Sequence, residues 1–135
     1  MPEKNNVGLD TTVILRLLTG EPEKQFEKAK RFLEEQLTNN KKLLVSDLVV
    51  AEAYFALHYH YKVPKSEAVA QLDSLLSSGM IHPAPGSVCQ KVLKESINHK
   101  AGFVDQIIHG QYCLLTEEMV SFDKLMCKLP GTIAL

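Results

Sequence analysis

The chain has 135 residues, of which 45% are hydrophobic, and a net charge of −1. This size is typical of one domain with a substantial core, and the near-neutral charge does not favour a protein that attracts nucleic acid through its overall field. No apolar run approaches the roughly 20 residues of a membrane helix, and MPEKNNVGLD lacks the apolar centre of a signal peptide. Three cysteines without a CxxC pair predict reduced thiols, so we expect a single cytoplasmic domain over residues 1–135.

Short apolar segments alternate with segments of helical periodicity. We expect strands over residues 5–9, 42–46, 80–84, 118–122 and, more weakly, 131–135. We expect helices over 11–20, from Pro22 to about residue 37, after a cap at Asp47, over 65–78, over 87–99 with a Ser87–Gln90 capping box, and over 102–115. This alternation predicts an α/β fold with a mostly parallel sheet and helices on both of its faces.

Two aspartates directly follow predicted strands, at the end of the sheet where open α/β folds bind ligands. Asp10 comes after the first strand and Asp123 after the fourth. Asp105 falls near the start of a predicted helix, whose dipole favours an anion, and His109 one turn later is a weaker candidate for the same place. Helix caps and a solvated first-turn carboxylate are the purely structural alternatives for these aspartates.

One charged side chain, Glu52, interrupts the apolar stretch LVVAEAYFAL over residues 48–57. On a helical wheel, apolar neighbours flank it on both sides, so we expect its carboxylate to lie in the core. A buried carboxylate needs a partner, because without one it is protonated or it destabilises the fold. Arg16 is one candidate partner, and a metal ion is the other.

We expect Asp10, Glu52, Asp105 and Asp123 to meet in one cleft. Two carboxylates about 4 Å apart repel by about 4 kcal/mol at an effective dielectric constant of about 20, so such a group needs a cation. Oxygen ligands select Mg²⁺ or Mn²⁺, and no Cys/His spacing suggests zinc. An acidic site for such an ion fits hydrolysis of a phosphodiester, in which the metal binds the phosphate and activates water.

Four motifs, VGLDTTVILRLL, LVSDLVVAEAYFAL, GFVDQIIHG and MVSFDKLMCKLPG, span nearly the whole chain. In order and spacing they resemble the four motifs of PIN domains, and most closely those of the VapC-type toxins of toxin–antitoxin pairs. The resemblance implies a three-layer α/β/α sandwich with a five-stranded, mostly parallel sheet. It also implies a ribonuclease that depends on Mg²⁺ or Mn²⁺ and cleaves single-stranded or structured RNA.

The resemblance assigns a role to each acid of the four motifs. Asp10 and Asp105 are the expected direct metal ligands. Asp123 is expected to ligate the ion or to orient water, and Glu52 is expected to act through water.

Other positions follow from the same resemblance. Thr12 and Ser121 stand at supporting hydroxyl positions, and Arg16 stands where VapC-type proteins often carry a basic residue that contacts a partner chain. RNA is the implied substrate, and a small antitoxin and a second copy of the chain are the implied partners. Two features depart from the family pattern: Thr12 replaces the usual Asn or Ser, and Gly110 and Tyr112 replace small, alanine-rich residues.

Two other functions fit part of the pattern. A PIN-like scaffold would bind RNA or protein without cleavage, although the presence of all four acids weighs against it. A phospho-acceptor receiver domain is another small α/β fold with an acidic Mg²⁺ pocket, but it needs paired acids after the first strand and an acceptor aspartate after the third. Here the first strand ends in a single acid, and MIHPAP contains none.

Overall fold

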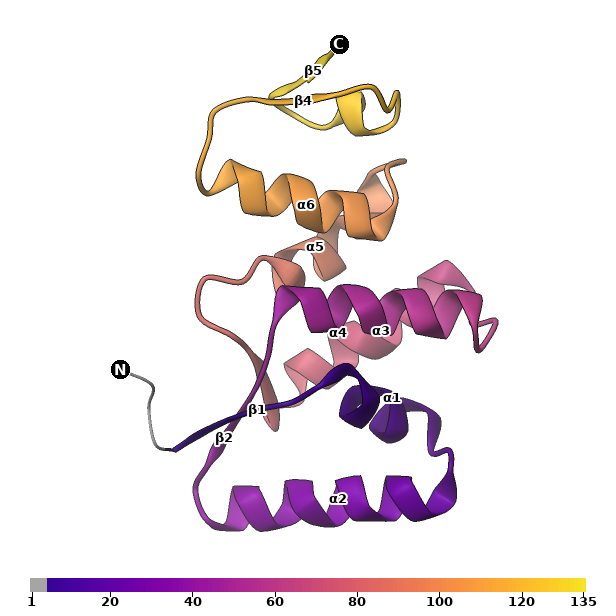
Figure 1. The fold of residues 1–135 in the computed structure, drawn as a ribbon, viewed down its shortest axis with the longest axis vertical. Coiled ribbons are helices and arrows are strands. Elements are labelled where there is room, and N and C mark those ends of the chain that lie inside the picture. Colours follow the sequence, from indigo (N-terminus) through magenta and orange to yellow (C-terminus); the bar gives the residue numbers. More distant parts are fainter. Residues whose placement is uncertain (1–4) are drawn as a thin grey trace. The chain divides into compact units, whose positions relative to one another are not determined.

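The computed structural model describes residues 5–135, and the chain divides into two units, Met1–Pro85 and Gly86–Leu135 (Figure 1). Unit 1 contains a parallel sheet with its strands in the order β1-β2-β3. Its elements, in chain order, are β1 (Asn6–Gly8), α1 (Thr11–Thr19), α2 (Glu23–Thr38), β2 (Lys42–Val45), α3 (Asp47–Tyr59), α4 (Lys65–Ser77) and β3 (Ile81–Pro83). Helical crossovers join the strands, as parallel pairing requires.

The core of unit 1 comes from the centre of the sheet and from the helices beside it. Leu43 of β2 lies opposite Ile81 of β3, and both side chains are fully buried. Ile14 of α1, Leu57 of α3 and Leu72 of α4 are also buried. The sheet and helices therefore bury apolar residues together, which is the packing that the alternating sequence pattern predicts.

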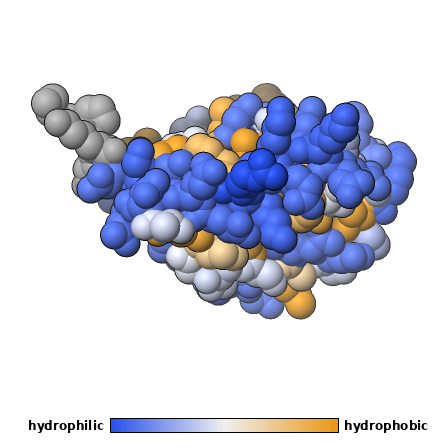
Figure 2. Space-filling model, turned by 90° about the horizontal axis from the view of Figure 1, so that it is seen from below, coloured by the Kyte–Doolittle hydropathy of each residue, from blue (hydrophilic) through white to orange (hydrophobic). Residues whose placement is uncertain are grey.

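The long helix α2 is amphipathic and mainly polar. Leu33 is buried, whereas charged side chains cover most of the rest of the helix. The face of the molecule shown in Figure 2, from below the view of Figure 1, is correspondingly mainly hydrophilic. Among the described residues, no helix is both long and apolar enough to cross a bilayer.

Unit 2 is built from short elements around a small core. In chain order these are α5 (Cys89–Glu95), the 3₁₀ helix η1 (Ser96–Asn98), α6 (Phe103–Cys113), β4 (Met119–Ser121), the 3₁₀ helix η2 (Met126–Lys128) and β5 (Thr132–Ala134). β4 and β5 pair in parallel, with Val120 opposite Ile133. Ala101, Met126 and Leu129 form a buried cluster against which Met119 packs.

The predicted fold class is confirmed: the chain is mixed α/β, and all five strands within residues 5–135 pair in parallel. The strands lie in two sheets, three in unit 1 and two in unit 2. The single domain over residues 1–135 stays a prediction.

Two predicted helix starts are wrong. Ser46, and not Asp47, caps α3, because its Oγ accepts the Val49 N–H at 3.2 Å while Asp47 is already helical. The Ser87–Gln90 capping box does not form, because α5 begins only at Cys89, after Val88. Gly86 has φ +79°, so the chain makes a left-handed turn just before this helix.

Gly110 has a packing role that explains one departure from the family pattern. A Cβ atom at this position of α6 would lie 3.1 Å from Val88 Cγ2 and 3.3 Å from Val88 Cβ. These distances are shorter than ordinary carbon–carbon contacts. The missing side chain therefore lets α6 approach the residues that lead into α5.

We predict that Gly110→Ala lowers the stability of the protein. Alanine favours the helix by about 1 kcal/mol, but forcing a methyl group into a filled site costs about 1–3 kcal/mol. The expected fall in Tm is about 2–6 °C. In a Val88→Ala background the closest atom, Val88 Cγ2, is removed and the 3.3 Å contact with Cβ remains, so the same substitution should lower Tm by less than it does in the natural background. A higher Tm for Gly110→Ala in the natural background would show that Val88 does not constrain this position.

Candidate active site

Asp10 lies where the end of β1 leads into α1. It is the N-cap of α1, and its Oδ1 accepts the Thr11 N–H at 2.8 Å. Its backbone is extended, with φ −83° and ψ 164°, and the side chain is exposed. The positive end of the helix dipole stabilises a carboxylate at this position. Asp10 therefore caps the helix with one oxygen and can present the other to a ligand.

Glu52 is exposed, so the prediction that it lies in the core is wrong. Its Oε2 accepts a hydrogen bond from the Thr11 hydroxyl at 3.3 Å. Thr11 itself is buried and links the two acids. Its N–H donates to Asp10, and its hydroxyl donates to Glu52. One threonine thus orients both acids of unit 1.

The predicted supporting hydroxyl in this region was Thr12, whose side chain is exposed on α1. The structure instead gives the contact with Glu52 to Thr11, which the sequence interpretation missed. A signal was available: Thr11 directly follows Asp10 and is the first residue of the helix, so its side chain lies beside the cap.

Arg16 is not the partner of Glu52. Its Nε donates to Gln25 Oε1 at 2.5 Å, from α1 to α2. Together with Thr12 and Phe32 it lines a shallow groove of about 270 Å³ between these helices. Arg16 as a residue is half-buried, so part of its side chain is accessible to a partner protein.

Asp105 and Asp123 form the acidic pair of unit 2. Asp105 lies in the first turn of α6 and is half-buried. Burial raises the pKa of the Asp105 carboxyl above its ordinary value, and the charge of Asp123 raises it further. Within residues 5–135, no hydrogen bond to the Asp105 carboxylate is formed. The pair thus holds two like charges in each other's field, and a hard cation would relieve their repulsion.

Asp123 is held by the backbone that follows it. Its Oδ1 accepts the N–H groups of Leu125 and Met126 at 2.8 and 2.9 Å, at the entrance to η2. The hydroxyl of Ser121 accepts the Asp123 N–H at 2.9 Å. Ser121 therefore supports the acid that follows it.

His109 has a structural partner. Its Nε2–H donates to the Pro130 carbonyl at 2.7 Å, and the Cys113 sulfur lies 3.6 Å from the same nitrogen. These contacts tie α6 to the segment before β5. They favour a structural role for His109 over a role beside Asp105.

Each unit contains two of the four acids. Among residues 5–135, no three or more His, Cys, Asp or Glu side chains gather into a group that could hold a metal ion. The donors present in each pair are carboxylate oxygens, which fit Mg²⁺ or Mn²⁺ in chemistry.

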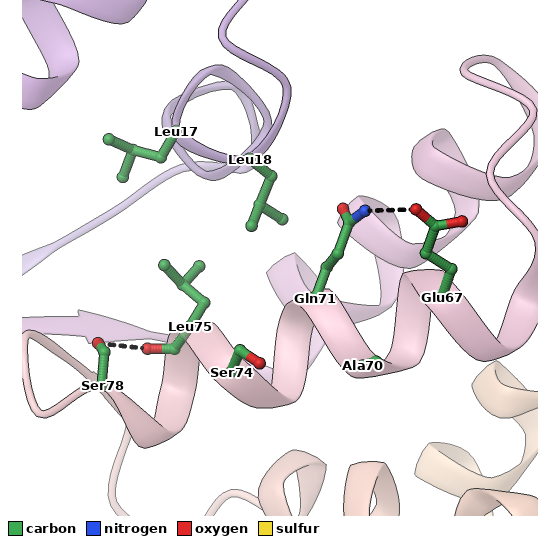
Figure 3. Close-up of a pocket in the computed structure, with 8 residues that line it drawn as sticks. All are labelled: Leu17, Leu18, Glu67, Ala70, Gln71, Ser74, Leu75 and Ser78. Atoms are coloured by element: carbon green, nitrogen blue, oxygen red, sulfur yellow. Dashed lines mark hydrogen bonds between the residues drawn. The ribbon is translucent and has the colours of Figure 1, made fainter.

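One hollow of unit 1 contains none of the four acids. It measures about 500 Å³ and lies between α1 and α4 (Figure 3). Leu17 and Leu18 of α1 lie across from Leu75 of α4, and Gln71 donates to Glu67 at 3.4 Å along its rim. Its lining offers apolar contact and no arrangement for hydrolysis.

Comparison of the sequence with known protein families identifies the family to which the four motifs belong. Residues 7–131 match the PIN domain, so the chain is a member of the PIN domain family. A VapC ribonuclease of Aquifex aeolicus (strain VF5) is similar to it, with 27% identity over 122 residues, which cover 90% of this chain and 90% of that protein. All four candidate acids lie within the matched residues.

We predict that Asp105→Asn stabilises the metal-free protein at neutral pH. A raised pKa means that the folded state binds this proton more tightly than the unfolded chain does. The stabilisation from the protonated acid is complete below the ordinary value of 3.8 and is lost as pH rises through the folded pKa. The difference between the variant and the natural protein should therefore grow from near zero in acid to a plateau at neutral pH.

Urea unfolding at a series of pH values, in the presence of chelator, measures this difference. Asp123→Asn serves as the matched variant. It should bring the raised pKa of Asp105 only part of the way back to its ordinary value, because burial is the larger cause of the shift. A loss of stability for Asp105→Asn at neutral pH would mean that its carboxylate stabilises the fold.

Proposed function

We propose that this PIN-domain protein is a metal-dependent endoribonuclease. The observation that carries the proposal is the acidic pair of unit 2, in which the half-buried Asp105 lies in the field of Asp123. Such an arrangement costs free energy in the metal-free protein, and functional sites often carry this kind of cost. Membership of the PIN family and the similarity to a VapC ribonuclease support the proposal.

We infer that Asp10, Glu52, Asp105 and Asp123 serve one centre for Mg²⁺ or Mn²⁺. When bound, such an ion polarises the phosphate of the RNA and activates a water molecule. Three of the four acids are oriented by hydrogen bonds: Asp10 and Glu52 by Thr11, and Asp123 by two backbone N–H groups. Contacts of this kind fix the direction of a carboxylate and leave oxygens available for a ligand.

The residues of the chain have separate tasks in this proposal. Asp10 and Asp105 would hold the ion, and Asp123 would hold the ion or receive the proton of a positioned water. Glu52 acts through a water molecule, held in place by the Thr11 hydroxyl. Ser121 supports Asp123 by accepting its N–H.

We propose further that the protein is the toxin of a toxin–antitoxin pair and that a small antitoxin protein inhibits it. The similarity to a VapC ribonuclease over most of both chains supports this role. Arg16, which is half-buried beside the groove of α1 and α2, is the candidate contact for that partner. A homodimer and a cytoplasmic location belong to the same proposal.

A non-catalytic PIN scaffold is the alternative. It would keep the fold and bind RNA or protein without hydrolysis. Measured cleavage separates the two functions directly. A receiver domain is disfavoured by the family match, and labelling with a small phosphodonor tests it.

We predict cleavage of RNA with Mg²⁺ or Mn²⁺ and none with excess chelator. Asp10→Asn and Asp105→Asn should each lower kcat/KM by about 100-fold or more, because each removes charge from the metal centre. Thr11→Val should cost about tenfold through the loss of its hydrogen bond to Glu52, and Thr11→Ser should retain activity. Glu34→Gln, on the exposed side of α2, is the control that should change nothing. Cleavage in chelator, or in both aspartate variants, would contradict the metal mechanism.

We predict that expression of the chain alone slows growth and that expression of Asp10→Asn does not. Co-expression with the neighbouring gene should restore growth and yield a stable complex. Arg16→Ala should weaken that complex while leaving the isolated nuclease folded. If a folded and RNA-active protein is harmless on expression, the toxin role is wrong and a housekeeping nuclease is the better description.

A further inference from the structure

Gln106 is a buried polar side chain that the proposed mechanism does not use. It is 5% exposed and belongs to the buried face of α6, together with Phe103 and Ile107. A glutamine amide among such apolar side chains costs free energy unless it is hydrogen-bonded. Gln106 also directly follows Asp105 in the sequence, so its bonds bear on the position of a candidate metal ligand.

The amide of Gln106 binds the segment that leads into α6. Its Nε2 donates to the Ala101 carbonyl at 2.8 Å and to the Ser96 carbonyl at 3.4 Å. Ser96 begins η1, and Ala101 directly precedes Gly102, the N-cap of α6. Gly102 makes no side-chain cap bond, so no capping side chain fixes the start of this helix. Gln106 supplies that restraint from one turn further along the chain.

The Asp105 carboxylate lies beside the same segment. A Cβ atom at Gly102 would lie 3.7 Å from Asp105 Oδ2, so the carboxylate is directed back toward the N-cap. The backbone N–H of Gln106 donates to the Gly102 carbonyl at 3.0 Å. Gln106 therefore holds Ala101 through its side chain and Gly102 through its backbone. A shift of this segment would change the surroundings of the Asp105 carboxylate.

Ala101 connects this segment to the residues that hold Asp123. Ala101 is buried in one cluster with Met126 and Leu129. The Met126 N–H donates to Asp123 Oδ1 at 2.9 Å. A short path thus runs from the Gln106 amide to the Asp123 carboxylate, through the packing of Ala101 and Met126. Because Asp105 and Asp123 lie in each other's field, their repulsion acts to separate them, and a fixed path resists that separation.

We propose that Gln106 is a positioning residue that sets the place of Asp105 relative to Asp123 for a divalent cation. The inference rests on the proposed metal-dependent function and adds a residue to it. Gln106 acts through Ala101 and not as a ligand. Groups that orient metal ligands from outside the coordination shell typically change metal affinity or activity by about 10- to 100-fold when they are removed.

Titration of Gln106→Met with Mn²⁺, followed by the EPR signal of the free ion, tests this role. Methionine is similar in length to glutamine but cannot donate hydrogen bonds to Ala101 and Ser96. The Kd for Mn²⁺ should rise about 10- to 100-fold. Gln71→Met is the matched control, because it removes an exposed amide bond to Glu67 in unit 1, and it should leave this Kd unchanged.

Two further variants separate positioning from stability. Ile81→Val changes the core of the sheet in unit 1, so it should lower Tm and leave the Kd for Mn²⁺ unchanged. Ala101→Gly keeps the carbonyl that Gln106 binds but removes the methyl group from the cluster with Met126, so it should raise the Kd. This smaller change also tests the path if Gln106→Met does not fold.

Steady-state cleavage of RNA, with Mn²⁺ saturating for each variant, supplies the second readout. Gln106→Met should lower kcat by about tenfold or more and leave KM nearly unchanged, because a displaced acid affects the transition state more than RNA binding. If folded Gln106→Met matches the natural protein in Mn²⁺ Kd and in kcat, or if Ile81→Val weakens Mn²⁺ binding equally, the inference is overturned and the proposed function stands. If the natural protein neither binds Mn²⁺ nor cleaves RNA, the proposed function itself fails, and the inference fails with it.

Discussion

Carboxylates that lie in one another's field repel, and the pair of Asp105 and Asp123 sets the central physical constraint of this protein. Asp105 is half-buried, so solvent screens its charge less than at an open surface, and its pKa is raised. The fold nevertheless holds Asp123 firmly, by two backbone N–H groups at the entrance to η2. A cation would turn this repulsion into attraction, and for this reason we propose a metal centre at the pair.

In unit 1, too, hydrogen bonds hold the candidate acids in place. Asp10 caps α1 and Glu52 accepts the hydroxyl of Thr11, so two acids far apart in the sequence are tied to one residue. Capping and ligation are therefore compatible uses of one carboxylate, because a carboxylate has several acceptor sites. The helix-cap interpretation of Asp10 and Asp123 describes how these side chains are held in place. It is compatible with the proposed role of both carboxylates as metal ligands.

The order of elements and the parallel pairing were predictable because hydrophobic periodicity and strand-end positions are local signals. The exposure of Glu52 was not. The stretch LVVAEAYFAL is apolar on nearly all sides, and such composition does not say which face of a helix is buried. Leu48 and Phe55 flank Glu52 and are themselves exposed, so the neighbours that suggested a core position belong to a surface stripe. The role of Thr11 and the close approach at Gly110 depend on tertiary contacts and could not be seen in the sequence alone.

We propose that Asp10 and Asp105 both contribute to Mn²⁺ binding, and calorimetric titration with Mn²⁺ tests this central proposal most directly. The natural protein, Asp10→Asn from unit 1 and Asp105→Asn from unit 2 would be titrated under the same conditions. We expect the natural protein to bind Mn²⁺ and each substitution to weaken the same binding event by about tenfold or more. If Asp10→Asn leaves the Mn²⁺ affinity unchanged while Asp105→Asn abolishes binding, the two pairs act separately, and the shared metal centre is contradicted.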